Sequence, residues 1–460
     1  MTAGLVVDLG AARRVHVVGV GGAGMSAIAS VLTAMGHHVS GSDLRDSPGL
    51  QRLAASGVEV HVGHAAEHVA GADLVAVSTA IPEQNAEVVA ARAAGIPVAR
   101  RADVLAAICA TRRTFAVSGT HGKTTTSSML ALVLVQAGVR PGFIIGGELN
   151  EIGSGAVWDT GDLFVVEADE SDGTFVELPA AAVVVTNVEA DHLDYYGDLA
   201  AIEAAFARFL AGAAGPNVAC ADDPGSARLG RAAGALLYGT AADADYRIVD
   251  PLTERSGSSF TLVGPNGELG PVRLPVPGLH NIRNAAAACA LAVEHGIPFD
   301  ACRAALARYA GVARRFQYRG RARDVTVVDD YAHNPGKVAA LLAAARAGGW
   351  GRVIAVFQPH RFSRTAALAH EFGQSFDDAD VVVLMDVYGA GETPVPGVNG
   401  KLLVDEVLGH RPWGRVAWLP RRADVLTYLR SELRAGDLCL TVGAGDITSL
   451  GDDILASLES

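Results

Sequence analysis

Short runs of Val, Ile and Leu alternate with Ala- and Leu-rich stretches along the whole chain. The runs include VHVVGV, TFAVSG, LFVVEAD, AAVVVTN, VIAVFQP and LCLTVGAG. Because successive positions in these runs are apolar, we interpret them as strands buried on both faces, which are typical of parallel sheets covered by helices. Several runs end in polar or Gly-rich residues, and ligands of open α/β sheets bind beyond the carboxyl ends of the strands. The pattern therefore predicts an α/β fold with its chemistry at the strand ends.

A chain of 460 residues is too long for one hydrophobic core, so two or three domains are expected. The helical stretch ADVLAAICA gives way to a new strand at residues 109–113, and the basic stretch YRGRARD precedes another at residues 318–323. These changes predict domains at residues 1–110, 111–318 and 319–460. Between residues 245 and 279, polar alternation with Gly and Pro predicts a β-hairpin excursion inside the middle domain.

Composition narrows the class of protein. Half of the residues are hydrophobic, which indicates a globular chain, and the net charge of -13 argues against a nucleic-acid partner, which needs a basic face. The five cysteines have no metal-ligand spacing, so reduced thiols in a reducing compartment are expected. No run approaches the roughly 18 apolar residues of a membrane span, and the first residues do not resemble a secretory signal. We therefore expect a cytoplasmic protein that binds neither membrane nor nucleic acid.

The first candidate site is a glycine turn. The run VHVV leads into GVGGAG and then into a helical stretch, so backbone N–H groups at a helix N-terminus can approach a diphosphate. Asp43 closes the next strand, where dinucleotide folds place an acid that binds ribose. Alone, this motif favours NAD, and a strand–helix turn without a ligand is the alternative. The candidate ligand-binding residues are Gly21, Gly22, Ala23, Gly24 and Asp43.

A second phosphate motif follows the run TFAVS. It has the GK[ST] ending of a P-loop, although Val117 stands where the standard motif has its first Gly. Lys123 is expected to reach the β- and γ-phosphates of a nucleotide, and Thr124 to offer its hydroxyl to magnesium. A dehydrogenase explains only the first motif and an ATPase only the second. The candidate residues of this loop are Gly119, Thr120, His121, Gly122, Lys123, Thr124 and Thr125.

Acidic clusters follow the next two strands. The run LFVVEADESD places Glu167 at a strand end, where a carboxylate can hold a metal ion against ATP, and the run VVVTNVEADHLD contains His192. An imidazole is an awkward magnesium ligand, because hard cations prefer oxygen, so His192 could instead bond a phosphate or a metal-bound water. Helix-capping acids are the alternative interpretation of the neighbouring Asp residues.

Polar groups also gather at later strand and helix ends. Asn284 at a helix start suits an adenine or ribose, and Arg315 in the run VARRFQ suits phosphate charge. Two further strand ends carry imidazole, phenol and guanidinium groups that suit an α-carboxylate and its amine. Taken singly, these residues can equally be surface groups or helix caps. The residues at those two strand ends are Tyr331, His333, His360, Arg361 and Arg364.

Taken together, the motifs resemble those of the Mur ligases over essentially the whole chain. The matching pieces, in family order, are GVGGAGMS, GTHGKTTT, EADESD, TNVEADHLD, PGLHNIRN, GVARRFQ, DDYAHNP, FQPHRFSRT, DVYGAGE and GAGDI. The resemblance implies an α/β enzyme of three domains: a Rossmann-like N-terminal domain, a central P-loop-type ATPase domain with a parallel sheet, and a Rossmann-like C-terminal domain. Asn334 departs from the pattern, since many relatives have a second His there, and this puts a role for position 334 in doubt.

The resemblance also implies an activity and its residues. GVGGAGMS and EADHLD are more similar to the branch that adds L-alanine to UDP-N-acetylmuramate than to the tripeptide-adding branch of peptidoglycan recycling. ATP, with magnesium or manganese, would activate the muramate carboxylate as an acyl phosphate, in a monomer or a homodimer. The turn at residues 21–24 would hold the sugar nucleotide. The residues that would attend ATP and the metal are Lys123, Thr124, Glu167, His192, Asn284 and Arg315; those that would surround L-alanine are Tyr331, His333, Arg361 and Arg364.

We expect His333 to act as the base, because an amine is mostly protonated near neutral pH. Two other classes of protein remain. An NAD-dependent oxidoreductase leaves GTHGKTT unexplained, and a nucleotide-dependent scaffold predicts ATP binding without an amide product.

Overall fold

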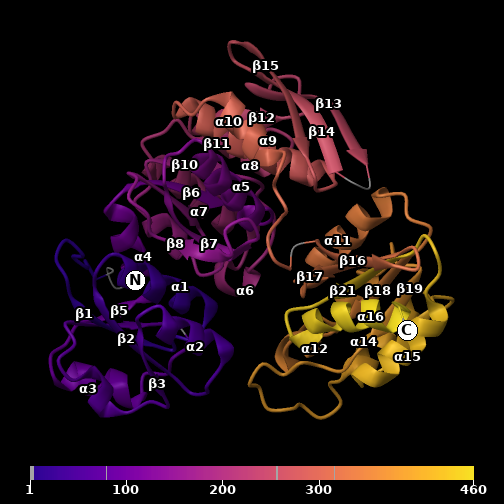
Figure 1. The fold of residues 1–460 in the computed structure, drawn as a ribbon, viewed down its shortest axis with the longest axis horizontal. Coiled ribbons are helices and arrows are strands. Elements are labelled where there is room, and N and C mark those ends of the chain that lie inside the picture. Colours follow the sequence, from indigo (N-terminus) through magenta and orange to yellow (C-terminus); the bar gives the residue numbers. More distant parts are fainter. Residues whose placement is uncertain (1–4, 79, 255–256, 315, 460) are drawn as a thin grey trace. The chain divides into compact units, whose positions relative to one another are not determined.

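The computed structural model describes residues 5–78, 80–254, 257–314 and 316–459. They form two compact units, the first containing the chain up to residue 252 with residues 257–310, and the second containing the chain from residue 311 onward. In the described part of the chain the strands form three sheets, two in the first unit and one in the second (Figure 1). The predicted α/β class is confirmed.

The first sheet is parallel throughout, with the order β3-β2-β1-β4-β5. Its strands are β1 (Arg14–Val18), β2 (His38–Asp43), β3 (Glu59–Val62), β4 (Leu74–Val77) and β5 (Val98–Arg100). The helical segments are α1 (Ala23–Ala34), α2 (Pro48–Ala55), η1 (Ala66–Val69), α3 (Ala86–Ala93) and α4 (Arg101–Ala110). The strand order changes direction at β1, which pairs with both β2 and β4. The turn after β1 therefore lies at the switch point, where open α/β sheets bind ligands.

The second sheet has the order β15-β14-β13-β12-β11-β10-β6-β9-β7-β8. Its strands are β6 (Arg113–Ser118), β7 (Gly142–Leu149), β8 (Ser154–Val157), β9 (Leu163–Glu167), β10 (Ala182–Val185), β11 (Val218–Cys220), β12 (Leu236–Gly239), β13 (Tyr246–Glu254), β14 (Gly257–Gly264) and β15 (Gly267–Leu274). β6 pairs in parallel with β9 and β10, so the segments after these strands meet at one edge. β14 and β15 pair antiparallel, which confirms the predicted hairpin excursion.

Alanine richness has a structural explanation in this part of the chain. The helical segments are α5 (Lys123–Gln136), η2 (Thr174–Glu177), α6 (Leu193–Tyr196), α7 (Leu199–Gly212), α8 (Pro224–Ala232), α9 (Leu279–Glu294) and α10 (Phe299–Leu306). Residues 285–292 of α9 are completely buried, and α9 packs against α5, whose residues 129–134 are also buried. A helix that is apolar on all sides is expected inside a protein, and small alanine side chains let the two helices approach closely.

The third sheet lies in the second unit and has the order β16-β17-β21-β18-β19-β20. Its strands are β16 (Gln317–Ala322), β17 (Val325–Asp330), β18 (Val353–Phe357), β19 (Val381–Leu384), β20 (Val416–Trp418) and β21 (Leu438–Val442). The helical segments are α11 (Pro335–Ala347), α12 (Phe362–Ala367), α13 (Ala369–Gln374), α14 (Gly400–His410), α15 (Arg422–Glu432), η3 (Asp446–Ser449) and α16 (Leu450–Glu459). The boundary expected at residues 318/319 falls inside β16, which pairs antiparallel with β17; the compact unit begins earlier, at Gly311.

The structure also bears on the expectation of reduced cysteines and on the expectation of a chain without membrane spans. Cys109, Cys220, Cys289, Cys302 and Cys439 are buried free thiols. Within the described ranges, none of the helices has both the length and the apolar character needed to cross a bilayer.

Candidate active site

The loop between β6 and α5 has the conformation that its glycines predict. Gly119 has a φ of 141° and Gly122 a φ of 82°, a backbone region that side chains rarely adopt. A Cβ on Gly122 would lie only 2.6 Å from Oδ1 of Asn284. Thr186 donates to the carbonyl of His121 at 2.6 Å, and the His121 N–H donates to Oδ1 of Asn187 at 2.7 Å. The segment after β10 thus fixes the loop, a role that the sequence motif alone did not reveal.

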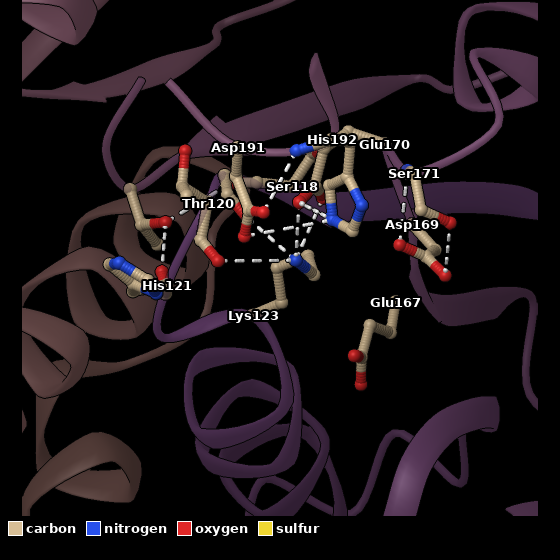
Figure 2. A network of polar contacts seen from close by, with 12 residues as sticks. Ser118, Thr120, His121, Lys123, Glu167, Asp169, Glu170, Ser171, Asp191 and His192 are labelled. Carbon is tan, nitrogen blue, oxygen red and sulfur yellow. Dashed lines mark hydrogen bonds and ion pairs between the residues drawn. The ribbon is translucent and has the colours of Figure 1, made fainter. Parts of the chain in front are cut away.

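Lys123 begins α5 and is held by an acid. Its Nζ donates to the Gly119 carbonyl at 2.8 Å and lies 2.9 Å from Oε1 and 2.7 Å from Oε2 of Glu170 (Figure 2). Glu170 is 2% exposed, and burial raises its pKa, although the charge of Lys123 opposes this shift. Glu170 belongs to the acidic run noted in the sequence, but only the structure singles it out as the partner of the lysine.

Thr124 and Glu167 come together as predicted for a cation site. The Thr124 hydroxyl donates to Oε1 of Glu167 at 2.9 Å, and the Gly146 N–H donates to Oε2 at 2.7 Å. In the described part of the chain, no three His, Cys, Asp or Glu side chains converge on one metal position. Mg²⁺ often takes only one or two protein oxygens, with water and phosphate as its other ligands. The hydroxyl and carboxylate therefore fit a divalent cation that arrives with a nucleotide.

His192 lies next to Glu170, the carboxylate that holds Lys123. Its Nε2 is 3.6 Å from Oε1 of Glu170 and 3.7 Å from Oδ2 of Asp191, and its φ is 53°. Figure 2 shows the Glu167 carboxylate apart from these side chains. A position beside Lys123 and Glu170 suits contact with a phosphate or a metal-bound water better than direct coordination next to Glu167.

Of the two residues predicted to contact ATP from later in the chain, the structure describes Asn284 but not Arg315. Asn284 on α9 is buried, and its Oδ1 accepts a hydrogen bond from the Thr126 hydroxyl at 3.2 Å. It therefore lies directly behind the loop at Gly122, and its predicted contact with ATP remains a prediction. Arg315 lies outside the described residues.

The first glycine turn is closed by backbone bonds and by Asp43. The N–H groups of Gly19 and Val20 donate to the Ser42 carbonyl at 2.8 and 3.0 Å, and the Gly21 N–H donates to Oδ2 of Asp43 at 3.0 Å. Helix α1 begins immediately afterwards, and its N-cap residue Gly22 provides no side-chain hydrogen bond. Backbone N–H groups of the first helical turn are therefore available to an anion.

A cavity of about 560 Å³ in the first unit reaches from the start of α1 to Glu167, the carboxylate bonded by Thr124. Its walls come from α1, α2, the start of α4, and the β7–β8 region. The residues that matter most to its chemistry are Gly24, Arg52, Arg101, Gly146, Glu167 and Asp169. Ala23 and Gly24 at the end of the glycine turn and the predicted cation ligand Glu167 thus face one space. Arg52 and Arg101 were not expected from the sequence, because neither belongs to a recognisable motif.

In the second unit, the ends of β17 and β18 bring aromatic and basic groups together. The rings of Tyr331 and His333 are 5.1 Å apart, His333 and His360 are 5.9 Å apart, and Nη1 of Arg364 lies 3.3 Å from Nδ1 of His360. Tyr388 stacks on His360 at 5.7 Å, and the sequence did not indicate this residue. Arg361, also expected here, precedes α12 with a φ of 70° and an exposed side chain.

The environment of His333 bears on its expected role as a base. Burial first, and then the positive charges of Arg364 and Lys337, lower the pKa of His333 to about 3. With its imidazole neutral, Nδ1 donates to the Tyr331 carbonyl at 2.9 Å, which leaves the Nε2 lone pair as an acceptor. In this state His333 can orient an ammonium group through a hydrogen bond, but it is a weak base. Its role in proton removal remains a prediction.

Comparison with known proteins matches three consecutive parts of the chain to family models. The family models that match are described as Mur ligase family, catalytic domain, at residues 14–113; Mur ligase middle domain, at residues 117–292; and Mur ligase, glutamate ligase domain, at residues 314–445. A UDP-N-acetylmuramate–L-alanine ligase from Kineococcus radiotolerans is 49% identical over 465 residues, which cover 98% of each chain. Another from Pelotomaculum thermopropionicum is 45% identical over 97% of this chain and 98% of its own.

Solved structures of Mur ligases share the fold of this chain over nearly its whole length. The crystal structure of UDP-N-acetylmuramate–alanine ligase from Thermotoga maritima matches with a TM-score of 0.81 and 27% identity, over 96% of this chain and 98% of that chain. A murein peptide ligase from Psychrobacter arcticus shares the fold with a TM-score of 0.70 and 24% identity, over 97% and 99%. Full-length similarity to the relatives, together with the three matching models, shows that this chain belongs to the Mur ligase family.

Proposed function

We propose that this enzyme joins L-alanine to the carboxylate of UDP-N-acetylmuramate while converting ATP to ADP and phosphate. The observation that carries the proposal is the single cavity that reaches both Gly24 of the first glycine turn and Glu167 beside the second. One space can then hold an anionic sugar nucleotide next to the triphosphate that activates it. The full-length relatives support the choice of this member of the family.

The sugar nucleotide is assigned to the first turn. The N–H groups of Gly21 and Gly22 are bonded to Asp43 and to the Gly19 carbonyl and so shape the turn, whereas those of Ala23 and Gly24 open α1, where the helix dipole favours a diphosphate. Asp43 closes the turn, and Arg101 adds a positive charge on the cavity wall.

The triphosphate is assigned to the second turn. Gly119, Thr120, His121, Gly122 and Thr125 form the cradle with Lys123, whose ammonium group would exchange part of its contact with Glu170 for phosphate oxygens. Thr124 and Glu167 would hold the magnesium or manganese ion, which when bound neutralises charge on the phosphate oxygens. His192 and Asn284 would complete this site, with Arg315 assigned to it by sequence alone.

The chemistry requires activation because a carboxylate is a poor electrophile. A carboxylate oxygen of the muramate attacks the γ-phosphorus of ATP, and ADP leaves. The amine nitrogen of L-alanine then attacks the acyl carbon, the carbon–oxygen bond to phosphate breaks, and the nitrogen loses a proton. Lys123 stabilises the negative charge that develops on the transferred phosphoryl group.

The amino acid is assigned to the second unit. The guanidinium of Arg364, half-buried beside His360, suits the α-carboxylate of L-alanine, with Arg361 as the second cation. Tyr331 and His333 would flank the amine and the methyl group. A cytoplasmic location, where ATP and both substrates occur, completes the proposal.

Phosphate release tests the proposal. We expect release from ATP only when UDP-N-acetylmuramate and an amino acid are both present, with L-alanine the best amino acid, and a mass increase of the sugar nucleotide that corresponds to one alanine residue. Nucleotide binding without product would instead indicate a scaffold, and a change in nicotinamide absorbance would indicate an oxidoreductase.

A further inference from the structure

A buried carboxylate surrounded by imidazoles lies under the first sheet, away from the residues assigned above. Glu87, in the first turn of α3, is completely buried. It accepts a hydrogen bond from the Ser42 hydroxyl at 2.6 Å and contacts Nδ1 of His64 at 3.0 Å and Nδ1 of His68 at 2.7 Å. Nε2 of His16 lies 3.5 Å away. We call Glu87 and these four partners the Glu87 cluster.

The cluster keeps a negative charge inside the domain. Burial alone would raise the pKa of Glu87, but the nearby imidazole of His16 and the hydrogen bonds with Ser42 and His68 outweigh it and lower the pKa to about 2. The N-terminus of α3 adds a favourable dipole. His61 stacks on His68 with ring centroids 4.1 Å apart and closes the outer side of the cluster. Among the described residues, no three potential metal ligands converge on one position here.

Stability alone does not account for this arrangement. A buried charge with several donors must recover a large desolvation cost, and well-packed apolar residues in such places are often equally or more stabilising. A hydrogen-bonded carboxylate does, however, fix the positions of all its partners at once. The relevant question is therefore what those partners hold.

The partners of Glu87 hold the first glycine turn. Ser42 is the residue whose carbonyl accepts the N–H groups of Gly19 and Val20, and the next residue is Asp43, whose carboxylate binds the Gly21 N–H. The Asp43 carbonyl in turn accepts the N–H of Gly63, which directly precedes His64. A movement of Ser42 or of the segment at residues 63–68 would therefore displace both Asp43 and the turn.

We propose that Glu87 is a positioning residue for the nucleoside diphosphate part of the substrate. It acts through Ser42 and His64, which fix Asp43 and the backbone N–H groups of the glycine turn. This inference rests on the proposed function, because it takes the turn to be the sugar-nucleotide site. It assigns to Glu87 no contact with the reacting atoms.

Binding of UDP to the full-length protein tests the inference by calorimetry, together with kcat and the KM values for UDP-N-acetylmuramate and ATP. Glu87→Gln keeps the size of the side chain and removes its charge. We expect the variant to bind UDP about tenfold more weakly, as for loss of a hydrogen bond to a charged group, with a similar rise in the KM for UDP-N-acetylmuramate. The KM for ATP and kcat should change by less than about twofold, a split that a general loss of structure would not produce.

A double-mutant cycle with Ser42→Ala tests whether the effect of Glu87 on UDP binding depends on Ser42. If Glu87 acts through Ser42, the double variant binds UDP no more weakly than the worse single variant. The matched control is His37→Asn: His37 is also buried, accepts the Arg13 N–H at 3.2 Å, and precedes β2 at its other end. This variant should bind UDP like the unmodified protein.

The outcomes separate the two proposals. Three results would each overturn the role of Glu87. They are unchanged UDP binding in Glu87→Gln, a double variant whose loss of UDP affinity is the product of the two single losses, and a loss of UDP affinity in His37→Asn equal to that in Glu87→Gln. If Glu87→Gln does not fold, Ser42→Ala alone decides, since loss of the same link must still weaken UDP binding without changing the KM for ATP. Failure of the unmodified protein to bind UDP-N-acetylmuramate would instead overturn the proposed function.

Discussion

Replacing Lys123 with Ala should affect both catalysis and folding, and the structure allows the two effects to be separated. The side chains of Lys123 and Glu170 are 12% and 3% exposed and lie within 2.7 Å of each other. Removing one partner of a buried ion pair leaves the other charge uncompensated, which costs about 3–5 kcal/mol. We expect Lys123→Ala to lower the free energy of unfolding by about 3 kcal/mol. This is the lower end of the range, because part of the lysine side chain reaches solvent.

The matched variant is Lys123→Ala combined with Glu170→Gln. Neutralising the acid removes the uncompensated charge, so the double variant should recover about 2 kcal/mol of the loss. Turnover of ATP should not recover, because neither replacement supplies the cation that stabilises the transferred phosphoryl group. Binding of UDP-N-acetylmuramate should persist in both variants, since the first glycine turn does not contact Lys123.

Urea unfolding measures the first effect, and phosphate release with calorimetric binding of UDP-N-acetylmuramate measures the others. Full turnover in Lys123→Ala would refute the assignment of ATP to the loop at residues 119–125. A double variant no more stable than Lys123→Ala would show that the ion pair with Glu170 is not what stabilises this part of the protein.

Other replacements test the remaining assignments. Gly122→Ala should destabilise the protein by about 1–3 kcal/mol in urea and raise the KM for ATP, because the residue has a φ of 82° and its Cβ would meet Asn284. Glu167→Gln should raise the magnesium concentration needed for half-maximal turnover at least tenfold while leaving UDP binding unchanged, and equal magnesium dependence would contradict the cation assignment. Arg364→Ala should raise the KM for L-alanine at least tenfold but not that for ATP, as steady-state kinetics can show. The pKa of His333 is depressed from its ordinary value of 6.5 to about 3, so its neutral form favours folding above pH 6.5 and this contribution is lost as the pH falls toward 3. Between pH 7.5 and 5 the unmodified protein should lose about 2 kcal/mol more stability in urea than His333→Gln, and parallel losses would contradict the burial of this imidazole.

The parts of the site that the sequence predicted are those whose chemistry is local. Gly119 and Gly122 are recognisable because their backbone conformation excludes most side chains, and Thr124 follows the lysine directly in the motif. Glu167 could be assigned because it ends a buried strand, and parallel neighbouring strands carry their ends to one edge of the sheet.

The parts that the sequence did not predict depend on packing between distant segments. Glu170 stands in a run of acids, and only its burial distinguishes it from Asp169 and Asp172 as the partner of Lys123. Arg101 lies at the start of α4 and acquires its role because α1 and the β7–β8 region enclose the same cavity. The position predicted for the second boundary falls inside β16, because the basic stretch there forms a strand that pairs with β17.

A net charge of -13 repels two polyanionic substrates at long range, so the proposed site must attract them locally. The N-terminus of α1, Arg52 and Arg101 line the cavity, and in the proposed site phosphate would compete with Glu170 for Lys123. Such partial charges act over a few ångströms, whereas exposed charges farther away than about 10 Å are largely screened at physiological salt. The proposed anion binding therefore depends on where the backbone N–H groups and guanidinium groups lie, and not on the net charge of the chain. The same reasoning gives Glu87 its importance, because a hydrogen-bonded carboxylate that is completely buried can fix those N–H groups without adding exposed negative charge to the cavity.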